Sequence, residues 1–381
     1  MTKKVLLTAT VQSHICQFHK PLVEMLHAHG YEVHVAARDN LAEKNGLKLD
    51  FVEKVYNIPF SRSPKSVDNI KAYKELKQIL AAQHYDIVHC NTPMGGIVTR
   101  LAAGKTRKAG TQVFYTAHGF HFYQGAPKKN WLVFYPIEKL FSRLTDQLIT
   151  ITLEDYKLAG EKFPCRSGHI HGVGVSTKRY HPVDEKEKKE RLQAENLTEN
   201  EFVILCVGEL NANKDQKTLI AAAAKLKQQM PEMKVLLAGN GPLEKQLKEQ
   251  IHQEHLEDTV IMIGYRSDLY RITPAVDLVV SCSYREGMPL NILEAMLCRK
   301  AVVASVNRGH KELVTDGKTG FLINPGDADA MADKILTIYH NRKLAEQMGQ
   351  AGYEKAKVYT AESVRRELEV VYGLDKQEQN I

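Results

Sequence analysis

Two glutamates eight positions apart carry the most informative chemistry in the sequence. Glu286 precedes a Gly-Met-Pro turn, and Glu294 falls in a helix expected to begin near Leu290. Unpaired N–H groups and the helix dipole at such a start attract an anion such as a diphosphate. Pro289 has no N–H, so the expected donors are Gly287, Met288, Leu290, Asn291 and Ile292. Carboxylates suit hydroxyl groups of a sugar and a ribose, although a capped helix with two surface glutamates is the alternative.

The elements that would position these groups alternate between strand and helix. In the first half the expected strands are 5–9, 32–37, 50–56, 86–90, 112–116 and 147–152, and the expected helices are 18–29, 66–83, 94–105, 130–143 and 153–162. Short β-rich runs alternating with amphipathic helical patterns indicate a parallel sheet covered on both faces.

The second half repeats the scheme. Its expected strands are 202–207, 234–238, 260–263, 278–281, 301–304 and 321–323, and its expected helices are 214–229, 243–255, 267–273, 290–298, 309–315, 327–340 and 342–357. The fold class is therefore α/β, with two doubly wound, Rossmann-like parallel-sheet domains at 1–175 and 176–360. Ligands bind at the carboxyl ends of such strands, so a cleft between two facing sheets is the expected active site.

Composition narrows the class of protein. The chain has 381 residues, 43% hydrophobic and 25% charged, without an apolar run long enough to span a membrane. Six cysteines without a Cys-x-x-Cys pair fit reduced thiols in a cytoplasmic protein. The net charge is +11 in residues 1–180 and −4 in 181–381, which suggests an anionic partner for the first half. No nucleic-acid-binding motif is visible, so nucleic acid is not expected.

Several motifs, in order along the chain, resemble the retaining glycosyltransferases of family 4, which have the GT-B fold. They are the segment 207–215, the Gly-Asn-Gly-Pro turn at 239–242, the segments 263–266 and 308–321, and the pair Glu286 and Glu294. Segments 8–19 and 115–122 look like the branch that builds capsular and exopolysaccharides, in particular EpsD-type glycosyltransferases. The resemblance covers almost the whole chain and implies that the helix at 361–375 packs back on the first domain.

The resemblance implies a role for each matched residue. Lys214 would neutralise the donor diphosphate, Glu286 would bind hydroxyls of the donor sugar, and Glu294 would bind the ribose. His118 would face the donor sugar from the other domain, so the implied catalytic set is His118, Glu286 and Lys214. The further implied donor-binding residues are Gly208, Gly264, Tyr265 and Arg266, which would hold the base partly through backbone groups. Gln12, Ser13 and His14 would form a loop that closes over the phosphate and acceptor side.

One departure from the family pattern concerns the diphosphate. Glu209 stands where most family members have arginine, and a carboxylate beside a diphosphate is repulsive. We therefore expect Glu209 to point away or a second cation to compensate, with Arg308 and Arg285 as candidates. Lys214 and the helix start would stabilise the leaving diphosphate without a metal, so no cofactor is expected.

The partners follow from this interpretation. The donor would be a nucleotide diphosphate sugar, most plausibly a UDP-sugar, and the acceptor a polyprenyl-diphosphate-linked saccharide. Segment 128–143 mixes aromatic and basic residues, and two interpretations fit it: peripheral binding to an anionic membrane, or packing in the core. Two other functions stay open, a UDP-N-acetylglucosamine 2-epimerase-like enzyme and a non-catalytic nucleotide-sugar-binding scaffold.

Overall fold

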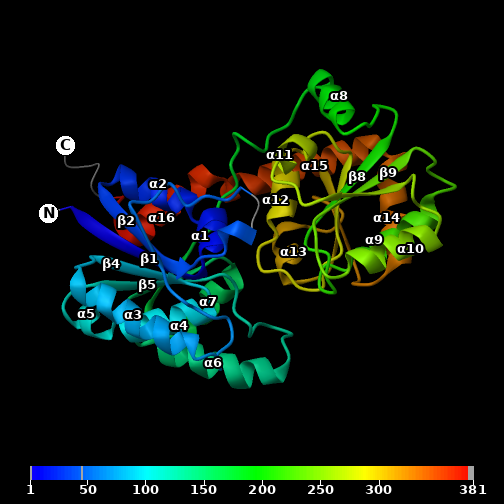
Figure 1. The fold of residues 1–381 in the computed structure, drawn as a ribbon. Coiled ribbons are helices and arrows are strands. Elements are labelled where there is room, and N and C mark those ends of the chain that lie inside the picture. The colour runs from blue at the N-terminus through cyan, green and yellow to red at the C-terminus, as the bar shows by residue number, and fades with distance from the viewer. Residues whose placement is uncertain (1, 44–45, 376–381) are drawn as a thin grey trace. The chain divides into compact units, whose positions relative to one another are not determined.

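The computed structural model describes residues 2–43 and 46–375, and its contacts divide them into two compact units. Unit 1 contains the chain up to Gly174 together with the segment that begins at Ala361, and unit 2 is Val175–Thr360. Each unit is a parallel sheet with helices, so the expected pair of doubly wound α/β domains is confirmed (Figure 1).

Unit 1 is built on a seven-stranded parallel sheet in the order β3-β2-β1-β4-β5-β6-β7. Its strands are β1 (Lys3–Val11), β2 (Tyr31–Arg38), β3 (Lys54–Asn57), β4 (Ile87–Asn91), β5 (Gln112–Ala117), β6 (Gln147–Thr150) and β7 (Arg166–His169). Its helices are α1 (Gln12–Phe18), α2 (Lys20–Ala28), η1 (Leu41–Glu43), α3 (Asp68–Ala82), α4 (Pro93–Ala102), α5 (Gly104–Lys108), α6 (Lys128–Ser142), α7 (Leu153–Lys162) and α16 (Ala361–Tyr372). Strand order reverses between β1 and β4, which is where ligands bind in such sheets.

Unit 2 is built on a six-stranded parallel sheet in the order β10-β9-β8-β11-β12-β13. Its strands are β8 (Phe202–Val207), β9 (Met233–Ala238), β10 (Val260–Gly264), β11 (Leu278–Ser281), β12 (Ala301–Ser305) and β13 (Phe321–Ile323). Its helices are α8 (Glu185–Ala194), α9 (Gln216–Leu226), α10 (Glu244–Gln253), α11 (Leu269–Ile272), α12 (Leu290–Leu297), α13 (Arg308–Leu313), α14 (Ala328–His340), α15 (Arg342–Ala356) and η2 (Lys357–Tyr359). Here the strand order reverses between β8 and β11.

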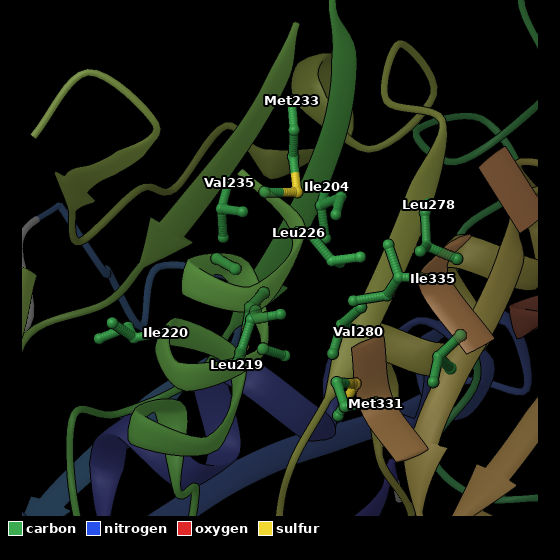
Figure 2. Packing of buried hydrophobic residues seen from close by; sticks show 14 of the residues in the cluster. Ile204, Leu219, Ile220, Leu226, Met233, Val235, Leu278, Val280, Met331 and Ile335 are labelled. Atoms are coloured by element: carbon green, nitrogen blue, oxygen red, sulfur yellow. The ribbon is translucent and has the colours of Figure 1, made fainter. Parts of the chain in front are cut away.

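The core of unit 2 lies on both faces of its sheet. Along β8, Ile204 packs into one hydrophobic cluster with residues of α9 and α14, whereas Leu205 packs into a second cluster with residues of α12. Figure 2 shows the first cluster, in which Leu219 and Leu226 of α9 and Ile335 of α14 lie against the sheet. Alternate residues of a strand point to opposite faces, so a continuous apolar run is what a sheet covered on both sides requires.

The predicted helix at 18–29 is wrong at its start. The structure has two helices, α1 and α2, separated at His19, whose φ of −118° and ψ of 6° depart from helical geometry. Pro21 lies two positions on and has no N–H to continue the hydrogen-bonding ladder of α1, so a new helix begins at Lys20 with proline in its first turn. Residues 12–14, expected to form a closing loop, are therefore the first turn of α1.

Two strand predictions also need correction. The run 50–56 was expected to be a strand, but β3 begins only at Lys54, because the Glu53 carboxylate accepts the Val33 N–H at 2.7 Å in place of a backbone carbonyl. The edge strand β7 was missed, since Arg-Ser-Gly-His at 166–169 carries no apolar pattern.

The C-terminal helix α16 belongs to unit 1. Its Tyr372 hydroxyl lies 2.5 Å from His89 Nδ1, and its Glu367 lies 2.5 Å from His171 Nδ1. Val371 lies over Gly168, where a Cβ would approach its side chain to 2.9 Å. The helix is thus anchored by two polar contacts and one close packing contact.

Candidate functional site

Two charged residues of unit 2 meet where the strand order reverses. Lys214 follows β8 and Glu286 follows β11, and these two strands are neighbours in the sheet. The Lys214 Nζ lies 2.5 Å from Glu286 Oε1, and both side chains are largely buried. The carboxyl edge of the sheet therefore holds a cation and an anion in contact at the position expected to bind a ligand.

The loop that carries Lys214 is fixed by its own side chains. Asn211 Oδ1 accepts hydrogen bonds of 3.0 Å from the N–H groups of both Asn213 and Lys214. Asn213 binds the loop after β11, because its carbonyl accepts from Tyr284 N–H at 2.8 Å and its Nδ2 donates to the Arg285 carbonyl at 3.1 Å. The two loops are thus joined before any ligand enters.

Two glycines let the Gly-Asn-Gly-Pro turn press against the β8 loop. Gly239 has φ of +146°, and a Cβ on it would lie 2.0 Å from the Gly208 carbonyl oxygen. A Cβ on Gly241 would lie 2.4 Å from the Leu210 carbonyl oxygen. Only glycine allows this approach, so the motif has a packing role as well as the role implied by the resemblance.

The start of α12 offers backbone donors, as the sequence predicts. The N–H groups of Gly287 and Met288 donate no hydrogen bond within the described residues, and Pro289 caps the helix without a side-chain hydrogen bond. Leu290 and Asn291 are in the first turn, where an α-helix has no acceptor for their N–H groups. The N–H of Ile292 differs, because it lies 3.2 Å from the Pro289 carbonyl.

Glu294 lies one turn into α12 in a partly buried setting. Burial raises the pKa of its carboxyl group to about 7, although a hydrogen bond from Tyr180 and the nearby charge of Arg179 both act to lower it. Neither Tyr180 nor Arg179 could be linked to Glu294 from the sequence, since they lie more than one hundred residues away in the segment before α8. A carboxyl group with this pKa changes charge near neutral pH.

Glu209 lies at the surface of the loop after β8. Its side chain is exposed, and its Oε2 accepts a hydrogen bond of 3.0 Å from Asn211 Nδ2. Arg285 is also exposed, and Arg308 begins α13, whose Gly309 N–H donates to the Glu286 carbonyl at 3.2 Å. Both arginines therefore belong to segments that join the Glu286 loop.

The Arg266 side chain binds two carboxylates of unit 2 and is not free to contact a nucleotide base. Its guanidinium donates to Glu195 at 2.7 and 2.8 Å and to Asp268 at 2.7 and 2.8 Å. This fork ties the end of α8 to the loop after β10. Tyr265 is 42% exposed and Gly264 has φ of +66°, so the same loop presents an open ring and a turn that favours glycine.

His310 is a buried site residue for which sequence reasoning assigned no role. It is fully buried, its Nδ1 donates to the Ser305 carbonyl at 2.6 Å, and its Nε2 has no hydrogen-bond partner in the described chain. Burial lowers the pKa of this imidazole, while the charge of Glu286 acts to raise it and that of Lys214 to lower it. A lone histidine in a helix has no spacing that would mark it in a sequence.

Unit 1 brings together three histidines at its own reversal of strand order. His14 lies on α1 after β1, His19 follows α1, and His118 follows β5; one ring nitrogen from each lies within 4.8 Å of the others. His14 Nε2 is 3.3 Å from His118 Nε2, and His118 Nε2 is 3.2 Å from Asn91 Oδ1 at the end of β4. The sequence singled out His14 and His118, but not their direct contact.

Burial keeps these imidazoles neutral. It lowers the pKa of His118 to about 4, and it is the largest cause of the pKa values well below 6.5 at His14 and His19. Gln12 and Ser13 are buried beside them, and Ser13 Oγ accepts from Asn40 Nδ2 at 2.9 Å. The first turn of α1 is therefore held in place rather than free to close as a loop.

A pocket of about 630 Å³ opens beside His14 and runs under α6. Its polar wall includes Thr10, Arg62 and Thr92, and its apolar wall includes Phe120, Phe122, Val133, Phe134 and Ile137. Helix α6 continues through Pro136, and it exposes Leu132 by 77%, Leu140 by 57% and Val133 by 51%. The core interpretation of segment 128–143 is therefore confirmed for one face of the helix, where Trp131 and Tyr135 pack against a buried cluster, whereas the face with Leu132 and Leu140 is exposed.

Two further observations bear on membrane and metal binding. None of the helices in residues 2–43 and 46–375 has both the length and the hydropathy to cross a bilayer. The expectation that the chain has no Asp-x-Asp pair to hold Mg²⁺ is wrong, because such a pair occurs at Asp327 and Asp329. Asp327 caps α14 by accepting from Ala330 N–H at 2.9 Å, and Asp329 lies 2.7 Å from Lys225, so both carboxylates have structural partners.

Comparisons with known proteins define the class to which this fold and site belong. A family model described as "Glycosyl transferases group 1" matches residues 187–355, and one described as "Glycosyl transferase 4-like" matches residues 4–152. The chain belongs to the group 1 glycosyltransferases, which confirms the family expected from the motifs. Its fold is GT-B, with two Rossmann-like parallel-sheet domains.

Individual relatives refine this assignment. The chain is 40% identical over 375 residues to the "Putative glycosyltransferase EpsD" of Bacillus subtilis (strain 168), covering 98% of this chain and 97% of that protein. It is 28% identical over 315 residues, 80% of each chain, to the UDP-Gal:alpha-D-GlcNAc-diphosphoundecaprenol alpha-1,3-galactosyltransferase of Escherichia coli. The solved structure of Anabaena Alr3699/HepE in complex with UDP is 22% identical with a TM-score of 0.77, covering 97% of this chain and 99% of that one, and shows the shared fold.

Proposed function

We propose that this chain is a retaining hexosyl- or N-acetylhexosaminyltransferase that uses a UDP-sugar in the synthesis of a bacterial extracellular or capsular polysaccharide. The observation that carries the proposal is the Lys214–Glu286 contact of 2.5 Å at the reversal of strand order in unit 2. Beside it, the first turn of α12 presents unpaired N–H groups. The relation to EpsD and to a UDP-Gal-dependent galactosyltransferase supports the donor class and the pathway.

Different residues bind the diphosphate, the sugar, the ribose and the base of the donor. Lys214 and the α12 N–H groups attract the diphosphate, and Arg308 and Arg285 are the candidates for a further cation. Glu286 accepts hydrogen bonds from sugar hydroxyls. Glu294, whose pKa burial raises to about 7, accepts hydrogen bonds from the ribose hydroxyls in its ionised form. Gly264, Tyr265 and Arg266 flank the base, with Arg266 acting through its backbone, since its side chain is bound to Glu195 and Asp268.

Bond breaking is assisted by charge stabilisation. As the bond between the anomeric carbon and the diphosphate oxygen breaks, Lys214 and the helix start stabilise the negative charge that develops on UDP. In the front-face reaction that the resemblance implies, the leaving phosphate takes the proton from the acceptor hydroxyl, and His118 contacts the donor sugar. This division of labour requires no divalent metal at the diphosphate, so donor binding is expected to be insensitive to EDTA.

The acceptor side is assigned to unit 1 by charge and exposed apolar surface. Residues 1–180 carry a net charge of +11, and α6 combines Lys128, Lys129 and Lys139 with the exposed Leu132 and Leu140. A polyprenyl-diphosphate-linked saccharide at an anionic membrane surface fits this combination. We therefore infer peripheral association of a cytoplasmic enzyme with the membrane, without nucleic acid as a partner.

A donor screen tests the proposal. The chain is incubated with uridine and guanosine diphosphate sugars and lipid-linked saccharides, and nucleotide release and glycosylated lipid are measured. Transfer with a UDP-sugar that is lost in Lys214→Ala supports the proposal. Conversion of UDP-N-acetylglucosamine to its 2-epimer without acceptor would instead favour the epimerase, and UDP-sugar binding without either product would favour the scaffold.

A further inference from the structure

We propose that His14, His19 and His118 of unit 1 form a binding site for a first-row transition-metal ion, for which we take Zn²⁺ as the representative. The inference rests on the contact geometry of these three side chains and does not depend on the proposed transfer reaction. The ion would be held by three neutral imidazoles, a ligand set that suits zinc, copper and nickel rather than magnesium or calcium.

The spacing of the ring nitrogens fits a metal. Zn²⁺ binds histidine nitrogen at about 2.0–2.1 Å, so two nitrogens in a tetrahedral site lie roughly 3.4 Å apart. The Nε2 atoms of His14 and His118 are 3.3 Å apart. One ring nitrogen of His19 lies within 4.8 Å of one ring nitrogen of each of the other two histidines, so side-chain rotations complete a three-histidine set.

The hydrogen bonds of the cluster leave its nitrogens incompletely satisfied. His118 Nε2 faces both His14 Nε2 and Asn91 Oδ1, yet one ring nitrogen carries at most one proton. His19 is 4% exposed, and its Nε2 has no partner within the described chain. A buried unpaired nitrogen costs free energy, and a cation that accepts several lone pairs at once removes that cost.

A nearby histidine shows the contrast. His89 is equally buried and belongs to the same group of rings, but its Nδ1 lies 2.5 Å from the Tyr372 hydroxyl and its Nε2 lies 2.7 Å from Thr116 Oγ1. Both of its nitrogens are therefore occupied. His19 thus differs from its neighbour His89 in having a buried ring nitrogen without a partner in the described chain.

The surroundings define the remaining ligand and the route of entry. His14 lines the pocket under α6 together with Arg62, whose positive charge also lies close enough to lower the pKa of His14. A positive side chain opposes a bare cation but attracts an anionic fourth ligand, such as hydroxide or chloride. The fourth position of the tetrahedron would thus face the pocket, through which the ion enters.

Metal binding would affect the proposed function through His118. An ion on Nε2 takes the lone pair of this histidine and fixes its ring, so a bound Zn²⁺ inhibits if His118 contacts the donor sugar. This consequence rests on the proposed function, whereas the binding itself does not. Zn²⁺ would then act as a reversible inhibitor, and a chelator would restore or leave unchanged the transfer activity.

Metal titration of the full-length chain tests the site. The chelator-treated protein is titrated with Co²⁺ and with Zn²⁺, and visible absorption and calorimetry are recorded. We expect one Co²⁺ per chain, with the d–d bands of a tetrahedral site and no thiolate charge-transfer band. His14→Gln and His118→Gln should each weaken binding at least tenfold, and the double variant should abolish it.

His169→Gln is the matched control. His169 and His171 form a second histidine pair, with ring centroids 4.7 Å apart, so nonspecific binding to paired histidines would be lost in that variant. His19→Gln is compared by thermal melting, because His19 is buried, while His14 and His118 are partly exposed. Unchanged Co²⁺ binding in the His14 and His118 variants, or no binding at micromolar metal, would overturn the site. If the His14 and His118 variants lose Co²⁺ binding but the wild type shows no transfer activity, the metal site is supported and only the proposed function is contradicted.

Discussion

The Nζ atom of Lys214 lies 2.5 Å from the Oε1 atom of Glu286, although the two residues are 72 positions apart and follow different strands. The ammonium group is thus held at the carboxyl edge of the unit 2 sheet by a carboxylate rather than by solvent. A diphosphate that arrives there must share this cation with Glu286, or take it over. The pair therefore links the affinity for the diphosphate to the residue proposed to bind the sugar.

The first prediction separates the effect of Glu286 on diphosphate affinity from its effect on sugar transfer. In Glu286→Gln the competing carboxylate disappears, so UDP should bind as tightly as to the wild type or a few-fold more tightly. Transfer should fall by about two orders of magnitude, because a hydroxyl acceptor of the sugar is weakened in the transition state. Calorimetry with UDP and a kcat measurement with UDP-sugar check the two halves.

Lys214→Met is the paired variant, since it removes the cation and leaves Glu286 unpaired and partly buried. Both UDP affinity and turnover should decrease, each by tenfold or more. Weaker UDP binding in Glu286→Gln would contradict the competition between carboxylate and diphosphate.

The second prediction concerns Arg266. Its guanidinium holds Glu195 and Asp268 with hydrogen bonds of 2.7–2.8 Å, so Arg266→Ala should lower the free energy of unfolding by about 1–3 kcal/mol. UDP affinity should change by less than threefold, because the proposed base contact uses the backbone. Urea unfolding and UDP calorimetry are the measurements, with Arg271→Ala as an exposed control on α11. A large loss of UDP affinity at unchanged stability would place the side chain in the base site instead.

The sheets and most helices could be predicted because their signals are local. Runs such as 202–207 and 278–281 are apolar on both faces, and their alternation with helices indicates a parallel sheet. The order of the strands was not predicted and comes from the structure. The break at His19 was missed because the apolar pattern of 18–29 continues across it, while Pro21 alone marks the new helix. Strand β7 was missed because it has no apolar pattern and depends on pairing with β6.

For the candidate site too, local features could be predicted from the sequence and contacts between distant residues could not. Glu286, Glu294 and the α12 donors lie within one short segment, so their spacing is visible in the sequence. The contact of His14 with His118, and of Tyr180 with Glu294, joins residues about one hundred positions apart, and only the folded chain brings them together. Of the two partners of Arg266, Asp268 is two positions away and Glu195 is 71 positions away, so only the folded chain shows that the side chain is bound to both.

The third prediction concerns the exposed face of α6. Replacing Leu132 and Leu140 by aspartate removes two exposed apolar side chains that would each contribute about 1.5–3 kcal/mol on insertion into a membrane. Flotation with anionic vesicles should therefore decrease at least tenfold, while the folding of the chain should be unaffected. Both leucines are exposed, so little packing is lost.

Ile70→Asp is the control for this prediction, because Ile70 is 58% exposed on α3. It should leave vesicle binding unchanged, and raised salt should weaken wild-type binding by screening the lysines of α6. Equal flotation of wild type and the double variant would remove the membrane from the proposal.

The fourth prediction follows from the raised pKa of Glu294, which burial moves from 4.5 to about 7. Between these values the folded chain keeps a proton that the unfolded chain releases, so the contribution of Glu294 to stability is greatest below about pH 4.5 and decreases up to about pH 7.

Glu294→Gln removes this dependence of the stability on pH. The stability of the variant relative to wild type should therefore rise between pH 5 and pH 8, by at most about 3 kcal/mol. Urea unfolding at several pH values measures the difference, with Glu346→Gln at an exposed position on α15 as the control variant. A constant difference between Glu294→Gln and wild type across this range would show that the carboxyl group is already ionised at pH 5 in the folded chain.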